Sequence, residues 1–285
     1  MQPSIVLCSQ VMLALEGVGV RSVRALATLD EVELGDHVCW RVDPGDAFAG
    51  AGSYVADGAL YGDKVVVIGS LGTVAVRRDR LPTTSVILDL PDRADTDVML
   101  AAVRRETRAA VREGFRSVRV LAERIPVTAP GDAEELLARE LKLDEFAAES
   151  GAIVVCAFRT AQWEASTLEH VACVHPQETG NRAARPAFRM FSTGTDSWGV
   201  DGVVDSECAT AFNAAVRAAT RRTPTVKLRF DAVEMIDAAG MHALVDAARH
   251  LPERRIVVEG ANEIVRLCWD LAGYATADVP VVIAA

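Results

Sequence analysis

The chain has 285 residues, of which 50% are apolar and 25% charged, and its net charge is -10. This composition is typical of a globular protein long enough for two domains, and it excludes disordered and fibrous chains. The acidic excess argues against bulk electrostatic binding of nucleic acid or of an acidic membrane surface.

No apolar stretch reaches the ~18 residues needed to span a bilayer. The residues after Met1 lack the basic start of a signal peptide, so we expect a cytoplasmic protein with neither nucleic acid nor membrane as partner. The six cysteines include no CxxC pair, which argues against zinc-ribbon and thioredoxin-like sites. In a reducing cytoplasm we expect them to be thiols.

Residues 1–32 are apolar and weakly patterned, and we expect an N-terminal extension there. Strands and helices then alternate. The expected strands are His37–Val42, Lys64–Gly69, Ser85–Leu90, Ser117–Leu121 and Ala152–Phe158. The expected helices are Pro44–Leu60, Asp95–Glu113, Asp132–Glu149 and Gln162–Val174. Such alternation predicts βαβ units and a mostly parallel sheet, with helices on both faces because the strands are continuously apolar.

The segment His175–Pro186 is polar, begins and ends near a proline, and has no periodicity. These features indicate a linker over residues 178–186. It would join a first domain at residues 33–177 to a second at residues 187–285.

After this segment the alternation of strands and helices begins again. The expected strands are Ala187–Ser192, Thr225–Phe230, Arg255–Glu259 and Val281–Ala284. The expected helices are Asp205–Thr220, Ala238–Leu251 and Asn262–Ala272. This order predicts a second, smaller α/β domain.

The most specific stretch of the chain is Val226–Leu251, where a strand ends at Phe230 and Asp231, and a short loop leads to Asp237 and a helix. This stretch resembles the STAS domain, the fold of bacterial anti-sigma factor antagonists and of sulfate transporter tails. Asp231, Asp237 and Gly240 match the family pattern, and Met241 stands where leucine is usual. The resemblance covers roughly residues 185–285.

The resemblance implies that the partner is an anti-sigma factor or a GHKL-type serine kinase. In such antagonists the kinase phosphorylates a serine at this helix N-terminus, where free N–H groups favour a phosphate. Here Ala238 and Ala239 fill the positions between Asp237 and Gly240, and no hydroxyl side chain occurs from Phe230 to Leu251. A phosphate switch at this loop therefore cannot operate. The alternative is that Asp237 is simply a helix cap and Gly240 a close-packing glycine.

The stretch Gly35–Gly69 resembles the start of the MEDS domain, a sensory module of methanogen and methylotroph regulators. The residues that carry this resemblance are His37, Cys39 and Trp40 at the start, and Cys156, Phe158, His175 and Pro176 at the end. It covers about residues 33–177. The implied fold class is α/β, with a RecA-like parallel-sheet sensory domain before the smaller STAS-like domain.

A nucleotide site is not expected in the first domain. The turn Arg41–Phe48 lacks the lysine and the glycines of a P-loop, and its Asp43 and Asp46 would repel phosphate. We therefore expect no ATPase activity.

His37 and Cys39 lie on one face of their expected strand, because side chains alternate along a strand. Ligands of parallel sheets bind at the carboxyl ends of the strands. We expect His37, Cys39, Cys156 and His175 to meet there, with Trp40 nearby, at a site for a small molecule, a metal or haem. The alternative is a buried histidine–cysteine pair whose polar atoms are satisfied, and the sequence requires no cofactor.

Three functions remain open from the sequence. The leading one is a cytoplasmic regulator in which the sensory domain controls protein binding by the STAS-like domain, in sigma-factor control. The second is an enzyme that uses the RecA-like cleft with His37 and Cys39 in catalysis, although no catalytic triad or carboxylate pair is recognisable. The third is a scaffold in which both domains bind proteins.

Overall fold

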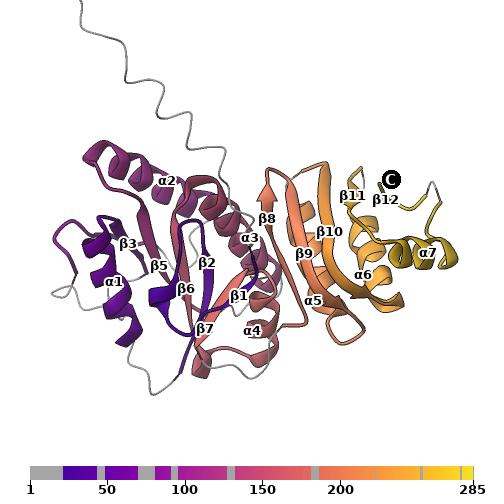
Figure 1. Ribbon diagram of the computed structural model, residues 1–285, viewed down its shortest axis with the longest axis horizontal. Coiled ribbons are helices and arrows are strands. Elements are labelled where there is room, and N and C mark those ends of the chain that lie inside the picture. The colour runs from indigo at the N-terminus through magenta and orange to yellow at the C-terminus, as the bar shows by residue number, and fades with distance from the viewer. Residues whose placement is uncertain are drawn as a thin grey trace, which may run out of the picture.

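The computed structural model describes residues 22–43, 49–69, 81–90, 96–126, 132–180, 186–221, 223–250, 253–276 and 278–284, and it contains two sheets (Figure 1). The first has seven parallel strands in the order β1-β7-β2-β6-β5-β3-β4. Its strands are β1 (Arg24–Ala25), β2 (His37–Val42), β3 (Lys64–Ile68), β4 (Val86–Leu88), β5 (Val118–Arg124), β6 (Ile153–Arg159) and β7 (Gln177–Gly180).

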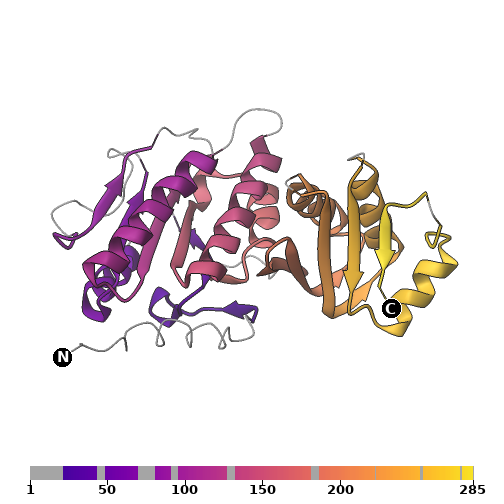
Figure 2. The same cartoon turned by 90° about the horizontal axis from the view of Figure 1, so that it is seen from above.

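Helices cover both faces of the first sheet (Figure 2). One face packs against α2 (Thr96–Glu113), α3 (Asp132–Ser150) and α4 (Ala165–Ala172). The other face packs against α1 (Ala49–Tyr61) and the short helix η1 (Leu29–Glu31). A short helix η3 (Thr160–Gln162) follows β6. Strands β3 and β6, in the interior of the sheet, are buried on both sides for this reason, which explains the apolar runs in their sequences.

The second sheet has five strands in the order β12-β11-β10-β9-β8, and β8 is antiparallel to β9. Its strands are β8 (Phe188–Gly194), β9 (Ser197–Val204), β10 (Thr225–Ile236), β11 (Arg255–Glu259) and β12 (Val281–Ile283). The helices of this part are α5 (Ala209–Thr220), α6 (Ala238–Arg249) and α7 (Glu263–Leu271). Buried and exposed residues alternate along the first half of β10, so one face of this sheet meets solvent.

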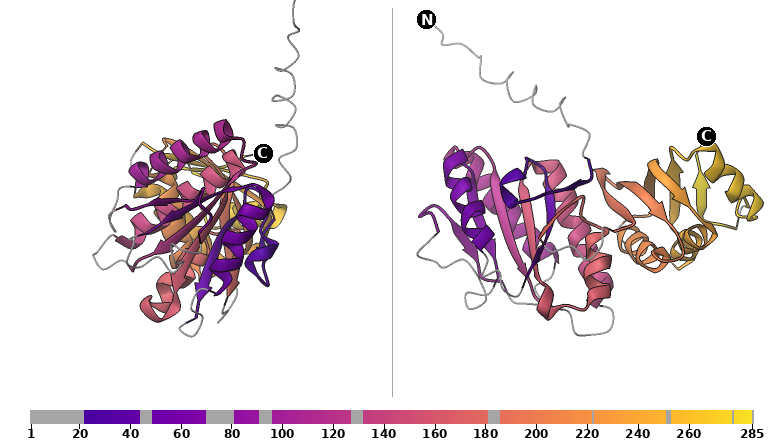
Figure 3. Two further views of the ribbon diagram at one scale, coloured as in Figure 1. Left: turned by 90° about the vertical axis from the view of Figure 1, so that its left-hand side faces the viewer. Right: turned by 60° about the horizontal axis from the view of Figure 1, so that its bottom comes forward.

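The two sheets lie side by side, and α3 stands between them (Figures 1 and 3). The helix packs on β6 of its own sheet and also on β8 and α5 of the second. The buried apolar residues of both parts form one continuous cluster across this junction. Two ion pairs also cross the junction: Glu134 on α3 lies 3.4 Å from Arg217 and 3.5 Å from Arg221. β8, an edge strand, is thus covered by a helix of the other part.

The α/β class, with a larger parallel sheet before a smaller α/β part, is confirmed. The expected linker is wrong at its start, because residues 177–180 form β7 inside the first sheet. The polar sequence of this segment indicated a linker, yet Glu178 is buried. Its carboxylate lies 3.1 Å from Arg189 on β8. The rest of that segment, residues 181–185, lies outside the described residues. The expected extension at residues 1–32 contains β1, which pairs with β7; residues 1–21 are not described.

Two further differences concern the second sheet. The strand β9 was not expected; its sequence contains Gly199 and Gly202, and glycine is uncommon within strands. Gly202 has φ 95°, and a Cβ there would lie 2.4 Å from the carbonyl oxygen of Ala187, so the close pairing with β8 requires glycine. β10 continues to Ile236, so a strand with two irregularities in its pairing replaces the loop expected after Asp231.

Among the described residues, no helix has both the length and the apolar character that crossing a membrane demands.

The buried carboxylate of Asp63 provides a test of the first domain's electrostatics. It accepts hydrogen bonds from Arg116 and Arg119, each at 2.8 Å, and its side chain has no exposure. Asp63→Asn should lower the free energy of unfolding by about 3 kcal/mol at neutral pH. The change removes the negative charge that balances Arg116 and Arg119 in a buried ion-pair group. Urea denaturation measures this loss, and Asp97→Asn, at a 77% exposed ion pair, should cost under ~1 kcal/mol.

The same variant has a defined pH dependence. Burial raises the pKa of Asp63, but the two arginines outweigh this effect and hold the pKa below the ordinary 3.8. A carboxylate with a lowered pKa stabilises the fold above its unfolded-state pKa, and that contribution is lost as the pH falls through the folded-state pKa. The difference between wild type and Asp63→Asn should therefore be constant near neutrality and shrink below pH 3.8. A difference that grows on acidification would contradict the assignment.

Candidate functional site

Four metal-ligating side chains meet under α3 in the first domain: His37, Glu140, Cys156 and His175. Each is completely buried, and one donor atom from each lies within 4.8 Å of all the others. His37 is the first residue of β2, Glu140 lies on α3 and Cys156 lies on β6. His175 lies between α4 and β7. Four separate segments thus contribute to the cluster.

The donor atoms lie close to one another. Glu140 Oε2 lies 3.5 Å from His37 Nε2 and 3.4 Å from His175 Nε2. The Sγ atom of Cys156 lies 3.5 Å from His37 Nε2. The two imidazole rings are stacked, with centroids 4.0 Å apart. Glu140 Oε2 and His175 Nε2 have no hydrogen-bond partner, although both are buried.

A second layer of groups fixes the orientation of these side chains. The other carboxylate oxygen of Glu140 accepts a hydrogen bond from Arg124, which is itself buried on β5. His175 Nδ1 lies 2.8 Å from the carbonyl oxygen of Val171. Because a carbonyl only accepts, this nitrogen is the protonated one, and Nε2 presents a lone pair to the cluster. His37 Nδ1 lies 3.6 Å from Asp144, one turn further along α3.

The pKa values of the ionisable groups in the cluster are shifted from their ordinary values. Burial, together with the neighbouring His37, lowers the pKa of His175 to about 4, so this ring is neutral near pH 7. Burial raises the pKa of Glu140, but the positive charge of buried Arg124 outweighs it and holds the pKa well below its ordinary value. Burial lowers the pKa of His37, and Asp144 and Glu140 outweigh that effect, so the net shift is upward.

Both nearby cysteines are poor nucleophiles. Burial raises the pKa of Cys39 to about 12 and, with Glu140, raises that of Cys156 well above 9.0. The thiolate is the reactive form of cysteine, so neither residue is activated for catalysis in this environment. The arrangement does suit metal binding, because a bound cation deprotonates a coordinating thiol.

The structure brings His37, Cys156 and His175 together, whereas Cys39 lies on the same sheet face outside the four-residue group. Trp40 lies on the opposite face, in the core beneath α1. The expected position at the carboxyl ends of the strands is wrong, because His37 begins β2 and the cluster is covered by α3.

Glu140 was missed by the sequence reasoning, although a signal for it exists. It follows Leu136 by four residues on α3, and both are buried. A carboxylate in the apolar stripe of a helix must be compensated by other groups, because burying a lone charge is costly.

The cluster is connected directly to the second domain. The other carboxylate oxygen of Asp144 accepts a hydrogen bond from the backbone N–H of Ser192 on β8, at 2.5 Å. Arg189 on β8 donates to the carbonyl oxygen of His175, at 2.6 Å. Both histidines are therefore linked to β8, one through the side chain of Asp144 and the other through its own backbone.

The expected switch loop of the second domain lies at the start of α6. Asp237 is the cap of this helix, since its carboxylate accepts from the N–H of Gly240 at 2.9 Å. The other oxygen accepts from the N–H of Ser206 at 3.1 Å. Ala238 is exposed and Ala239 half-buried, while Met241 is buried. Asp231 is separate from the cap and pairs with Arg229 at the surface.

Gly240 is required where it stands: a Cβ on this residue would lie 2.7 Å from the carbonyl oxygen of Val204.

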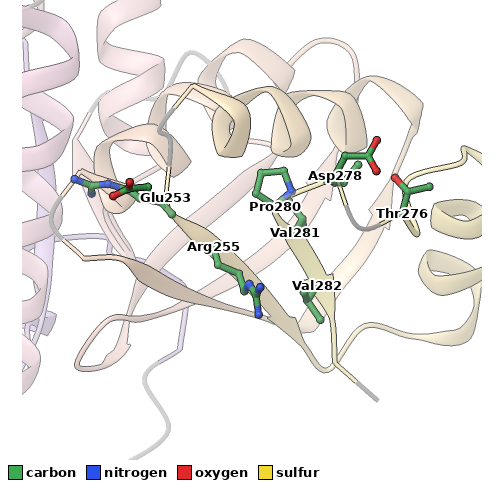
Figure 4. A pocket seen from close by; sticks show the side chains of 9 residues that line it. Glu253, Arg255, Thr276, Asp278, Pro280, Val281 and Val282 are labelled. Carbon is green, nitrogen blue, oxygen red and sulfur yellow. The ribbon is translucent and has the colours of Figure 1, made fainter.

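A hollow on the surface of the second domain contains none of these residues (Figure 4). It lies beside β11 and β12, and its lining includes Glu253, Arg255, Thr276, Asp278 and Val282.

Comparison with known proteins identifies one family. Residues 36–176 match the family model of the MEDS domain, described as the methanogen/methylotroph, DcmR sensory domain. No curated protein matches the chain. The anti-sigma factor antagonist SpoIIAA in its unphosphorylated form is a similar solved structure, with 15% identity and a TM-score of 0.27. The match covers 35% of this chain and 89% of that one, and a similarity of this size assigns neither partner nor mechanism.

The cap at Asp237 can be tested by substitution. Asp237→Ala removes the acceptor for the N–H groups of Gly240 and Ser206, and should lower the free energy of unfolding by about 0.5–2 kcal/mol. Asp231→Ala is the matched control; its side chain pairs with exposed Arg229, so it should change stability by less than ~1 kcal/mol. Thermal unfolding of the two variants should rank them in this order, and equal midpoints would show that Asp237 does not cap α6.

Proposed function

We propose that this chain, whose residues 36–176 are a MEDS sensory domain, is a regulatory protein that couples the buried cluster to protein binding by its second domain. The single observation that carries the proposal is the connection between the cluster and β8. Asp144 contacts His37 on one side and the backbone of Ser192 on the other, so a change at the cluster has a direct path into the second sheet. In this proposal the protein regulates transcription by controlling the availability of a sigma factor.

The proposed partner of the second domain is an anti-sigma factor or a GHKL-type serine kinase. Support comes from the motif of Asp231, Asp237 and Gly240, with Asp237 at the helix N-terminus. A protein-binding role also fits α7, which exposes Ile264, Leu267 and Leu271 on one face, with relative accessibilities of 73%, 59% and 78% for these residues. Exposed apolar groups gathered on one helix face are typical of interaction surfaces.

The proposed regulation differs from a phosphate switch at α6. Ala238 and Ala239 have no hydroxyl, so a partner kinase has no acceptor at the start of this helix. The unmodified domain would remain competent to bind. Control would come from the first domain, through α3 and β8.

The regulation can be tested with the partner kinase and ATP. Affinity capture from the native cell extract should retain a protein with a GHKL ATPase domain, and wild type should remain unmodified from Phe230 to Leu251. Ala238→Ser or Ala239→Ser should become phosphorylated and lose affinity, because each places a hydroxyl at the helix N-terminus. Ala209→Ser, at the first residue of α5, is the matched control and should behave as wild type. Phosphate on wild type in this loop would overturn the proposal.

Coupling between the two parts can be tested with Asp144→Asn. This change keeps the size of the side chain but removes the charge that joins His37 to Ser192. We expect the affinity for the captured partner to change by about fivefold or more, the lower end of ordinary allosteric coupling. Asp97→Asn, on the exposed side of α2, should leave the affinity unchanged. Equal affinities for both variants, with folding verified by circular dichroism, would contradict coupling through α3.

A further inference from the structure

We propose that His37, Glu140, Cys156 and His175 bind one zinc ion in tetrahedral coordination. The donors would be Nε2 of each histidine, Oε2 of Glu140 and Sγ of Cys156. The inference deepens the sensory role proposed above by naming the ligand class of the cluster. A regulatory effect of zinc rests on the proposed sensory function, whereas zinc binding itself does not depend on it.

The separations between donors agree with the size of a zinc site. Zinc bonds to nitrogen, oxygen and sulfur measure about 2.0–2.3 Å, which places the donors of a tetrahedron about 3.3–3.8 Å apart. The three contacts described here are 3.4, 3.5 and 3.5 Å. These values come from three different pairs of side chains. All four donors lie within 4.8 Å of one another, so an ion at the centre requires the farthest pair to close by about 1 Å at most. A haem macrocycle could not be inserted between side chains at these distances.

The cluster also contains polar atoms that the protein itself leaves unsatisfied. His175 Nε2 presents its lone pair to Glu140 Oε2, and neither atom has a hydrogen-bond partner. Two facing acceptors repel each other, and their complete burial denies them water. A cation between them turns this repulsion into two bonds.

The surrounding groups have the arrangement found around metal ligands. A metal-binding histidine commonly has its second nitrogen next to a carbonyl or carboxylate oxygen, which fixes the ring. His175 Nδ1 contacts the carbonyl of Val171 at 2.8 Å, and His37 Nδ1 lies 3.6 Å from Asp144. Arg124 binds the second oxygen of Glu140 and leaves Oε2 directed at the cluster.

The charges of the loaded site balance. Zinc and Arg124 together carry three positive charges, and Glu140, Asp144 and the thiolate of Cys156 carry three negative ones. Charge balance matters here because each of these side chains is buried, where a net charge is costly. The mixed nitrogen, sulfur and oxygen set suits zinc and excludes magnesium and calcium, which prefer oxygen alone.

The test uses the full-length purified chain. Protein prepared without chelator should contain one zinc per chain by elemental analysis, and removal by a chelator should lower the thermal midpoint. Addition of CoCl₂ to the stripped protein should give the visible absorption of tetrahedral cobalt and a thiolate-to-cobalt charge-transfer band in the ultraviolet. Zinc in excess should remove both. Failure of the stripped protein to take up either ion would overturn the proposal.

Matched cysteine variants assign the sulfur ligand. Cys156→Ser should lose the charge-transfer band and bind cobalt at least tenfold more weakly. Cys39→Ser should keep the band, because Cys39 is equally buried and pairs in register with Cys156 but is not one of the four donors. A band that disappears in Cys39→Ser and persists in Cys156→Ser would reject this ligand set. Glu140→Gln should weaken cobalt binding while the band remains, and this readout is independent of the second domain's partner.

Failure of the zinc test and failure of the regulatory proposal can be told apart. Metal content and cobalt spectra concern the first domain and require no partner. Partner capture and phosphorylation concern the start of α6 and require no metal. A chain that binds the partner but no zinc would retain the regulatory function and lose only this inference.

Discussion

The burial of Glu140 is the constraint on which the rest of the structure depends. A carboxylate without access to water is unstable unless other groups compensate it, and here Arg124 on β5 does so with a hydrogen bond while His37 Nε2 lies 3.5 Å away. Around this carboxylate the start of β2, the end of β5 and the residues before β7 meet beneath α3. The candidate site is therefore built into the core of the first domain.

The same helix makes the two parts of the chain interdependent. α3 directs Glu140 and Asp144 toward the first sheet, and it also packs on β8 and α5 of the second. Asp144 serves both sides, because one oxygen faces His37 and the other accepts from Ser192. A junction with a continuous apolar core and buried hydrogen bonds differs from two domains on a free linker. Any adjustment of the cluster must be accommodated by β8 or by distortion of α3.

The two candidate sites differ in how they meet solvent. The cluster in the first domain is closed, and its raised thiol pKa values argue for binding rather than for nucleophilic chemistry. The start of α6 is open, with Ala238 exposed and the Asp237 cap in place. In the proposed function the closed site would hold the ligand and the open one would contact the partner protein.

Local patterns in the sequence determined the α/β class, the order of most strands and helices, and the Asp237 cap, because periodicity and capping act over a few residues. The family motif identified the two histidines and Cys156, but it did not show where in the fold they lie. Tertiary structure alone decided the rest. Polar residues 177–180 became a buried strand because Arg189 neutralises Glu178 across the junction. Glu140 joined the site because Arg124, sixteen residues away, meets it in space. Such pairings depend on contacts between distant segments, which local patterns do not record.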